Sequence, residues 1–518
     1  MISKQFRCLG VFVSLSLMMT SMAGCSNKNK EEAVPTSSSK PVELTVEVFD
    51  RGVQGNAPVD NNYLTKWVNE EFGKKNNITV KYVPVLRADE STKIGILMAS
   101  DAAPDICTTN VSSIVQNFVN QGGIAELDTY IDKYGPNIRS YIGETALNYG
   151  IMNGKQFYIP GKRIFRGIVS SNIRKDWLDK LGLPIPTTTD ELYKTLKQFK
   201  EKDPGKVGNK LIPFDMSAQN MQMGDYSLID SFKEKMTEEQ LATTPLLSQP
   251  GVKEGYRFIN KLYNEGLINK EFALDKDSKK FQANIANGYS GFYMANVGDT
   301  YAVSPEVVST LIKNIPTAEM APLDPFSNAE GKHPKMISSP TGLSNFIPAS
   351  SKHIVEAVKY LNWQCDPKVL MTLQNGIEGT QYELKDGLPS PKTGDFEKVS
   401  NGDYCLVVNG REMGNYDKTL KAQSLQFVGF EDLYMKATKF ATTDGVPGVY
   451  MEPNSVAAKY KGIQDGKSLD IKIKAITASP KDFDKVYDSL VNDYMTNSGG
   501  NETMAEAVKI YQRMYGKK

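Results

Sequence analysis

The sequence predicts an α/β protein built from parallel sheets and crossover helices. Residues 42–48 alternate apolar and polar side chains, as a half-buried strand does, and residues 63–72 space their apolar side chains along one helical stripe. A second strand at 78–86 is rich in β-branched residues, and a helical stretch around 94–98 leads to a short strand at 106–109. The order strand, helix, strand, helix, strand is typical of a parallel sheet with crossover helices.

The middle of the chain continues this pattern with clearer signals for helix ends. Residues 174–181 predict a short helix that stops at Gly182, and Thr188-x-x-Glu191 is a capping box that opens another helix. Further segments each have the periodicity of one element: helices at 252–263 and 354–361, and a strand at 289–295. No repeat of fixed period occurs, so the chain is expected to form packed lobes.

Length and composition exclude several classes of protein. At about 100–200 residues per domain, the 518 residues predict two to four compact units. The 61 Lys and Arg residues against 60 Asp and Glu residues give a net charge of +1, which provides no basic surface for nucleic acid. Only two histidines are present, so we do not expect a mechanism that depends on imidazole side chains.

The N-terminus carries a processing signal. Lys4 and Arg7 precede an uncharged apolar run that is shorter than the roughly 20 residues of a membrane-spanning helix, so a signal peptide at 1–24 is favoured. The run ends in Ser-Met-Ala-Gly-Cys, which resembles a bacterial lipobox with Cys25 as the lipidated residue. Residues 25–41 are polar and aperiodic, as a flexible tether would be. The alternative is an ordinary secretory peptide with Cys25 incidental.

The remaining cysteines are Cys107, Cys365 and Cys405. Three residues so far apart do not form a disulfide framework, and we expect them to be small buried hydrophobic side chains. No Cys-x-x-Cys pair occurs, which excludes a structural zinc site of that type.

Three motifs carry a resemblance to a known family. They are Arg-Lys-Asp-Trp-Leu-Asp-Lys-Leu-Gly-Leu at 174–183, Leu-Tyr-Asn-Glu-Gly-Leu-Ile at 262–268 and Gly-Ile-Glu-Gly-Thr-Gln-Tyr at 376–382. In this order, and with the lipobox, they resemble extracellular solute-binding proteins of ABC importers, in particular the LipO-like and YtcQ-like lipoproteins of family 1. The resemblance extends from Cys25 to about Tyr382.

The resemblance implies a two-lobed periplasmic-binding-protein fold of type II, with a hinge between the lobes and a ligand held in the cleft. Lobe 1 would consist of residues 42–160 plus 321–374, and lobe 2 of residues 161–320 plus 375–518. The expected hinge segments are Pro160-Gly161, the stretch from Pro316 to Pro325, and Asn375-Gly376.

The loop after the capped helix differs from its counterpart in many relatives, where spaced oxygens suit calcium. Here residues 203–213 keep one carboxylate and one amide, Asp203 and Asn209, and add Lys206 and Lys210. Because a calcium ion needs about six oxygen ligands, we expect no calcium at this loop, and we expect neither a metal nor a cofactor elsewhere.

Catalytic motifs are missing from the sequence: the phosphate-binding, dinucleotide-binding, zinc-protease and nucleophile-elbow patterns are all absent. Acid pairs such as Asp101 with Asp105, or Glu378 with Glu383, leave a glycoside hydrolase as an alternative. A surface sensor or adhesin lipoprotein is the other alternative. We expect a binding protein and not an enzyme.

Candidate ligand-binding residues follow from the rule that ligands lie beyond the carboxyl ends of strands in α/β sheets. By this rule the candidates after the first strands are Asp50, Arg51, Thr109 and Asn110. Residues at comparable ends of motifs in the second lobe are Arg174, Tyr289, Tyr293, Glu378 and Tyr382.

The expected function is capture of an oligosaccharide, unchanged and without metal, by a monomer that delivers it to an ABC permease. The protein would be lipid-anchored on the outer side of the cell membrane, most simply in a Gram-positive cell. The sequence supplies 25 Tyr, 21 Phe and 3 Trp as possible sugar platforms. The neutral net charge argues against strongly charged solutes drawn in by long-range steering.

Overall fold

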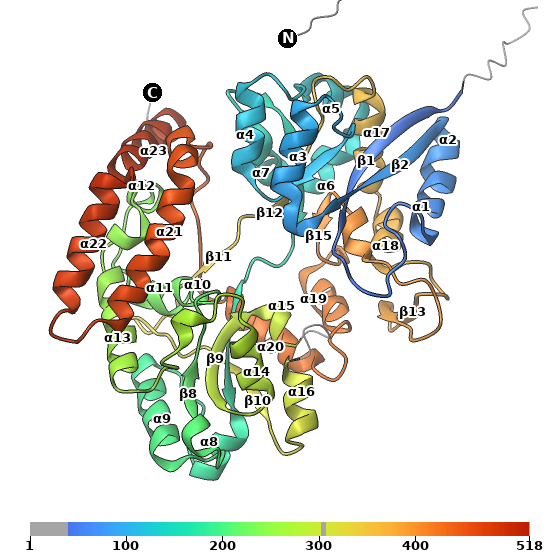
Figure 1. The fold of residues 1–518 in the computed structure, drawn as a ribbon. Coiled ribbons are helices and arrows are strands. Elements are labelled where there is room, and N and C mark those ends of the chain that lie inside the picture. The colour runs from blue at the N-terminus through green and yellow to red at the C-terminus, as the bar shows by residue number, and fades with distance from the viewer. Residues whose placement is uncertain (1–39, 302–306, 517–518) are drawn as a thin grey trace, which may run out of the picture. The chain divides into compact units, whose positions relative to one another are not determined.

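Two four-stranded sheets organise the chain, and each contributes to its own hydrophobic core. The computed structural model describes residues 40–301 and 307–516 (Figure 1). The predicted signal peptide, Cys25 and all but the last two residues of the predicted tether lie outside these described ranges. Within them, every helix is too short or too polar to cross a membrane.

The first sheet has the strand order β15-β6-β12-β3 and is extended by a parallel pair, β1 and β2. A bridge between Val46 and Ile106 connects that pair to β3. The strands are β1 (Val42–Asp50), β2 (Ile78–Leu86), β3 (Cys107–Thr109), β6 (Tyr158–Arg163), β12 (Thr341–Phe346) and β15 (Val408–Asn409). The helices of this part are α1 (Tyr63–Val68), α2 (Lys74–Asn76), α3 (Glu90–Ala99), α4 (Ser112–Asn120), α5 (Asp128–Tyr134), α6 (Pro136–Ile142), α7 (Glu144–Leu147), α17 (Ile354–Gln364) and α18 (Pro367–Asn375). Two small hairpins complete it: β4 (Ile151–Met152) with β5 (Lys155–Gln156), and β13 (Tyr382–Lys385) with β14 (Leu388–Pro391).

The second sheet has the order β10-β7-β9-β8. Its strands are β7 (Val169–Arg174), β8 (Ile212–Asp215), β9 (Ser290–Asn296) and β10 (Met320–Leu323). The helices that precede the last strand are α8 (Lys175–Leu181), α9 (Thr189–Lys202), α10 (Gln222–Asp225), α11 (Leu228–Phe232), α12 (Glu238–Thr243), α13 (Val252–Asn264), α14 (Lys279–Ala286), α15 (Val297–Thr300) and α16 (Val307–Asn314). Those near the C-terminus are α19 (Tyr416–Ser424), α20 (Glu431–Thr442), α21 (Ser455–Thr477), α22 (Phe483–Asn497) and α23 (Gly500–Tyr515).

The α/β class is as expected, but the sheets are mixed, whereas we expected mainly parallel ones. Strand β7 is antiparallel to both β9 and β10, and β12 is antiparallel to both β6 and β3. Strands β7 and β12 are the ones by which the chain enters a sheet from the other sheet. A strand that enters this way has no crossover helix to make it parallel to its neighbours.

Helix boundaries agree closely with the signals in the sequence. Thr188 caps α9 by accepting a hydrogen bond from the Glu191 backbone N–H at 3.2 Å. The Glu191 carboxylate binds Thr187 and not Thr188, so the reciprocal half of the expected capping box is shifted by one residue. Gly182 ends α8 in the left-handed conformation with φ 65°, which glycine adopts without strain.

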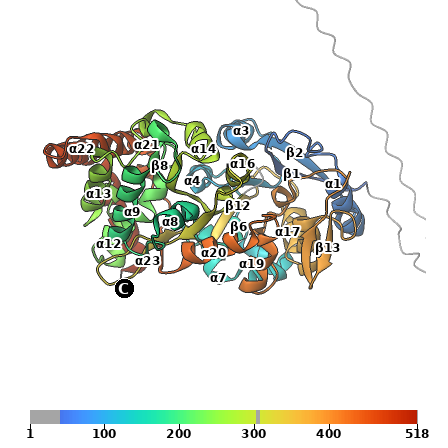
Figure 2. The same cartoon turned by 90° about the horizontal axis from the view of Figure 1, so that it is seen from below.

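The C-terminal helices pack on the second sheet's side of the chain. Helix α21 contacts α13, and α23 contacts α12, so segments more than 190 residues apart in sequence lie side by side (Figure 1). Helices α19 and α20 are likewise neighbours (Figure 2). The core around the second sheet therefore includes side chains from α21 and α22, such as Ile476 and Tyr487.

The chain passes between the two sheets at three places, each later than the expected hinge position. The first passage is 164–168, because Pro160 and Gly161 lie inside β6. The second is 324–340, after β10 has paired with β7. The third follows β15, because residues 404–408 lie in the core of the first sheet. Of the turn residues that suggested earlier hinges, Pro160 and Gly161 are strand residues of β6, and Asn375 and Gly376 end helix α18.

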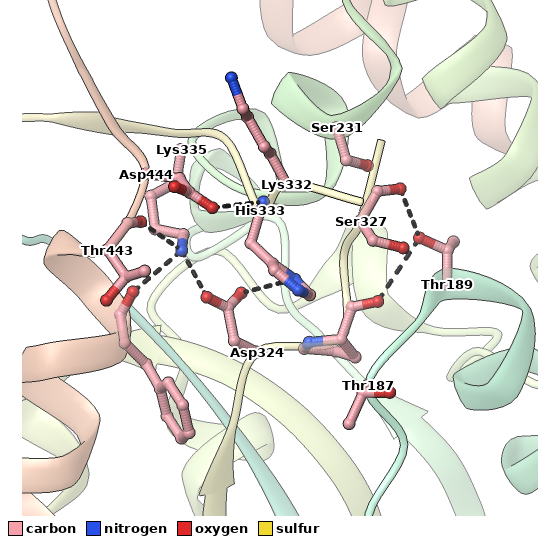
Figure 3. A network of polar contacts seen from close by, with 12 residues as sticks. Thr187, Thr189, Ser231, Asp324, Ser327, Lys332, His333, Lys335, Thr443 and Asp444 are labelled. Atoms are coloured by element: carbon pink, nitrogen blue, oxygen red, sulfur yellow. Dashed lines mark hydrogen bonds and ion pairs between the residues drawn. The ribbon is translucent and has the colours of Figure 1, made fainter. Parts of the chain in front are cut away.

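The second passage is held by a polar network (Figure 3). The buried Lys335 ammonium donates to the Asp324 carboxylate at 2.5 Å and to the carbonyls of Phe440 and Thr443 at 2.9 and 2.8 Å. Both carbonyls belong to the carboxyl end of α20, where a positive charge is favourable. Strand β11 (Lys335–Ile337) also pairs with β16 (Gly445–Pro447). The passage is thereby attached to the segment that follows α20.

Candidate functional site

Three adjoining cavities form one cleft between the two sheets. The first and second cavities share Asn409, Gly410 and Gln423, and the second and third share Arg163, Ile168 and Ser338. Their volumes are about 450, 230 and 560 Å³. We call this continuous space the cleft, and it is large enough to bury a ligand of several rings.

The strands of the first sheet bring most lining residues to one edge. The carboxyl ends of β1, β3, β6 and β15 deliver Arg51, Asn110, Arg163 and Asn409 in turn. The second sheet's side contributes residues around the start of α15, among them Asn296 and Gly298, together with Tyr226 from the end of α10. This follows the rule for α/β folds that ligands bind beyond the carboxyl ends of strands.

The predicted residues at the ends of β1 and β3 lie at or next to the cleft. Arg51 lines it and forms a two-pronged ion pair with Asp403, with both N–O distances 2.6 Å. Asn110 lines both the first and the third cavity. Asp50 lines a neighbouring cavity of about 260 Å³ that shares Arg51 and Ser400 with the first cavity of the cleft, and its carboxylate accepts the Gly52 N–H. Thr109 is buried and donates its hydroxyl to Glu90 at 3.1 Å, so it supports the edge without lining it.

Two predicted residues of the second sheet lie away from the cleft. Arg174 is only 2% exposed and forms an ion pair with Asp176, with N–O distances of 2.8 Å. Tyr289 accepts a hydrogen bond from Lys210 and precedes β9. Because β7 runs opposite to β9, the carboxyl end of β7 and the amino end of β9 share the edge that faces away from Asn296. The sequence predicts strands well, but it does not reveal this direction.

The other three predicted residues do not line the cleft either. Tyr293 is buried and lines a further cavity of about 290 Å³, which shares Asn296 with the second cavity of the cleft; the Tyr293 hydroxyl has no partner among the described residues. Glu378 and Tyr382 lie at the β13–β14 hairpin, joined by a backbone bridge. Tyr382 is 3% exposed.

Aromatic rings of the cleft were missed by the sequence analysis. Tyr149, Tyr158, Tyr226 and Tyr450 all line the third cavity. The rings of Tyr149 and Tyr450 lie 4.3 Å apart at an interplanar angle of 48°. Burial raises the pKa of Tyr158 to about 12, so its hydroxyl remains neutral at physiological pH. Tyr450 lies in an irregular segment with no periodic signal, and it meets Tyr149 only through the fold.

Amide side chains of the cleft were also missed. Gln374, Asn375, Asn409, Gln423 and Gln426 line the first cavity. Gln374 bonds the Gly410 carbonyl and the Glu412 N–H, and it thereby holds the loop after β15. The only sequence feature that could have predicted these amide residues is the strand β15 beside them. With two residues, β15 is too short to produce a recognisable alternation of apolar and polar side chains.

Positively charged side chains outnumber negatively charged ones along the cleft. Arg51, Arg87, Arg163 and Arg411 line it, and Asp403 is the one carboxylate among its lining residues. Burial and the neighbouring Arg166 lower the pKa of Arg163, and burial lowers the pKa of Arg411 to about 10. Glycoside hydrolysis generally needs two carboxylates at the scissile bond, and here the single one is ion-paired.

Asp105, one of the acids considered as catalytic candidates, has a structural role. Asp105 accepts hydrogen bonds from the backbone N–H and hydroxyl of Thr45 at 2.9 and 2.7 Å, and from the Ser351 hydroxyl at 2.7 Å. It therefore joins β1 to the segment after β12. Neither it nor Asp101 lines the cleft.

The loop at 203–213 uses its carboxylate internally. Asp203 accepts the backbone N–H groups of Val207 and Gly208 at 3.0 and 2.8 Å. These bonds close the loop with its own amides, and both carboxylate oxygens take part. Within the described ranges, no group of three or more His, Cys, Asp or Glu side chains is placed to hold a metal ion.

Comparisons with known proteins agree with this geometry. Residues 57–369 match the family model "Bacterial extracellular solute-binding protein". The chain is 27% identical to Lipoprotein LipO of Bacillus subtilis over 520 residues, covering 97% of this chain and 98% of LipO. It is 30% identical over 239 residues to the polygalacturonan/rhamnogalacturonan-binding protein YtcQ of Bacillus subtilis, covering 44% of this chain and 46% of YtcQ.

A solved structure shows the same fold. The ABC-transporter substrate-binding protein FusA of Streptococcus pneumoniae, in complex with kestose, superposes with a TM-score of 0.65. The sequences are 18% identical, and the match covers 92% of this chain and 100% of FusA. The two-lobed α/β fold and the LipO-like and YtcQ-like resemblance are thus confirmed, and the family and its structural neighbours are binding proteins of ABC transporters, not enzymes.

Proposed function

Because the chain belongs to the bacterial extracellular solute-binding protein family, we propose that it captures an oligosaccharide in the cleft and delivers it, as a monomer, to the permease of an ABC importer. The observation that carries the choice of ligand is the combination of tyrosine rings and amide side chains along one continuous cleft. Sugar rings have apolar faces ringed by hydroxyl groups, and these two kinds of side chain complement them. The name of YtcQ, a polysaccharide-binding protein, supports the same ligand class.

The lobes of this proposal are defined by the two sheets. Residues 42–163 plus 341–409 form the first lobe, and residues 169–323 plus the helices from α20 onward form the second. The three passages between the sheets are the hinge. An enclosed ligand would contact Asn110 and Tyr158 from the first lobe, and Asn296 and Tyr226 from the second. Contacts to both lobes make closure favourable only when a ligand is present.

The proposal includes a lipid anchor on Cys25 and a location on the outer face of the cell membrane. Its support is the lipobox-like sequence together with the curated name of LipO as a lipoprotein. In a Gram-positive host, Cys25→Ser should release the protein into the medium or leave it unprocessed. The measurement is the distribution between membrane and medium by immunoblot. If the variant is retained on membranes at the wild-type level, Cys25 is not the anchor.

The ligand class is tested by isothermal titration calorimetry against a panel of oligosaccharides, amino acids and short peptides. We expect an oligosaccharide to bind with micromolar affinity, about 8 kcal/mol, and to be recovered intact. Tyr450→Ala should weaken that binding about 5-fold, because it removes one ring contact worth about 1 kcal/mol. Binding of peptides alone, or a cleaved sugar, would contradict the proposal.

Tyr289→Ala is the matched control. Tyr289 is also a partly exposed tyrosine with one hydrogen bond, but it lies at the edge of the second sheet that faces away from the cleft. Its loss should leave the oligosaccharide affinity unchanged. An equal loss in both variants would show that the cleft is not the binding site.

A further inference from the structure

Guanidinium groups outnumber carboxylates in the cleft, and two of the four arginines have partners that neutralise them. Arg51 pairs with Asp403, and Arg87 pairs with Glu90. Arg163 and Arg411 are different. Within the described ranges, no carboxylate lies within ion-pair distance of either one.

Arg163 lies at the end of β6 and lines both the second and the third cavity. Its Nε donates to the Thr341 carbonyl at 3.2 Å. The positive charge of Arg166 lowers the pKa of Arg163, and the Arg166 Nε donates to the Ser338 carbonyl at 2.7 Å. Two like charges at the hinge side of the cleft thus face no protein anion.

Arg411 lies just after β15 and lines the first cavity. Its Nη1 is buried and has no hydrogen-bond partner among the described residues. With the Gln426 amide turned so that its oxygen faces the guanidinium, Nε and Nη2 are satisfied, but Nη1 is not. A guanidinium offers five N–H donors in a planar fork; here the Nη1 donors are unpaired but enclosed, so a ligand group can reach them only if the neighbouring side chains move.

An unpaired charge in a partly buried site is unfavourable without a ligand, so its presence indicates what the site binds. A carboxylate matches the arginine fork with two parallel, charge-assisted hydrogen bonds. A neutral hydroxyl would leave the charge uncompensated. The protein's net charge of +1 does not oppose this, because the two arginines act locally within the cleft.

We propose that the oligosaccharide is acidic, with carboxylate groups of uronate units bound by Arg163 and Arg411. This inference rests on the proposed function and specifies its ligand class. It also replaces the expectation, drawn from net charge, that strongly charged solutes are excluded.

The test is calorimetric titration at low salt with short oligogalacturonates, oligoglucuronates and alginate oligosaccharides. Each acidic ligand is paired with its carboxyl-reduced counterpart, which has the same linkage and no charge. We expect at least one acidic ligand to bind at least about 10-fold more tightly than its reduced form, and its affinity to fall as salt rises. If neutral oligosaccharides bind as tightly as any acidic one, the inference is wrong and the proposed function stands. If no oligosaccharide of either kind binds, the proposed function itself fails.

Variants assign the carboxylate contacts. Arg163→Gln and Arg411→Gln should each reduce affinity for the acidic ligand about 10- to 100-fold, while the weak binding of the reduced form changes little. Arg163→Lys and Arg411→Lys should recover part of the loss through charge. Arg139→Gln is the control, because Arg139 lies outside the cleft in an exposed ion pair with Asp132.

Folding of the variants is followed by the melting temperature without ligand. Arg411→Gln removes an uncompensated charge, so its melting temperature should equal or exceed that of the wild type. A lowered melting temperature, together with equal losses for acidic and neutral ligands, would show a structural role for the arginine and would overturn the assignment.

Discussion

At the scale of single residues, the first sheet contains a carboxyl group that is poorly solvated. Glu47 on β1 is 1% exposed; one oxygen accepts the Thr108 N–H at 3.0 Å, and the other has no partner among the described residues. Burial raises the pKa of Glu47 to about 8, and Glu90 adds to the increase. The folded protein therefore keeps this proton at a pH where the unfolded chain has lost it.

The consequence is a stability that falls with pH. The contribution of Glu47 is complete below its ordinary pKa of 4.5 and is lost as pH rises through about 8, because the folded state binds more protons than the unfolded state in that window. Glu47→Gln should make the melting temperature less dependent on pH between 5 and 9, as measured by differential scanning calorimetry. Burial also raises the pKa of Asp215, to about 6. Asp215 therefore makes the melting temperature depend on pH near the lower end of this range in both the wild type and Glu47→Gln.

Glu43→Gln provides the comparison for this measurement. Glu43 lies on the same strand, but its side chain is half exposed in an ion pair with Lys81. Replacement of Glu43 should leave the pH dependence of the melting temperature between pH 5 and 9 as it is in the wild type. A Glu47→Gln protein with the wild-type slope would mean that Glu47 is ionised in the fold.

At the scale of elements, one amide side chain completes the end of the longest helix. The Asn260 Nδ2 of α13 reaches the carbonyls of Ala475, Ile476 and Ala478 at 2.8–3.0 Å. These carbonyls belong to the carboxyl end of α21, where a helix leaves its last acceptors without partners of its own. Asn260 is 2% exposed, so water cannot substitute.

Asn260→Ala should therefore destabilise the protein by about 1–3 kcal/mol, the range for buried groups left unsatisfied. The measurement is the urea midpoint followed by far-ultraviolet circular dichroism. Asn264→Ala is the matched control, because Asn264 also contacts the Ala478 carbonyl but from a more exposed position, and it should cost less. Equal losses would assign the effect to helix α13 and not to the end of α21.

At the scale of the whole molecule, the second passage between the lobes depends on a buried charge pair. Lys335 is 3% exposed, and its ammonium binds Asp324 and the carboxyl end of α20 (Figure 3). Lys335→Met should cost about 3–5 kcal/mol, because the buried Asp324 loses its ammonium partner and keeps only the more distant His333, whose Nδ1 lies 3.8 Å from the carboxylate. The double variant Lys335→Met with Asp324→Leu should recover part of the loss. Urea unfolding of both single variants and the double variant gives the interaction energy between Lys335 and Asp324. If the two single losses of unfolding free energy simply add in the double variant, the two side chains do not form a pair.

Closure of the lobes is the second expectation at this scale. An oligosaccharide that contacts both lobes should favour the closed arrangement, so small-angle scattering should give a smaller radius of gyration with ligand than without. Tyr450→Ala at the same ligand concentration should show a smaller change, because less protein is bound. An unchanged radius at saturating ligand would contradict closure.

The sequence alone was sufficient for features that depend on near neighbours. The β2 strand at 78–86 follows from its β-branched residues, and the Thr188 cap follows from a hydroxyl three residues before a backbone N–H. Burial of Cys107 and Trp177 follows from their positions within apolar patterns. The family could also be inferred, because its motifs are short contiguous segments.

The tertiary structure decided which side chains meet in the cleft. Arg174 and Tyr289 are residue types that are common in binding sites. The antiparallel course of β7 and β9 nevertheless places them at the edge of the sheet that faces away from the cleft. The rings of Tyr149 and Tyr450 are in contact although 301 positions separate them, and Arg411 follows a strand of two residues. Periodicity and caps depend on interactions within a few residues, which the sequence shows directly. A cleft depends on strand direction and on contacts between distant segments, which are determined only when the whole chain has packed.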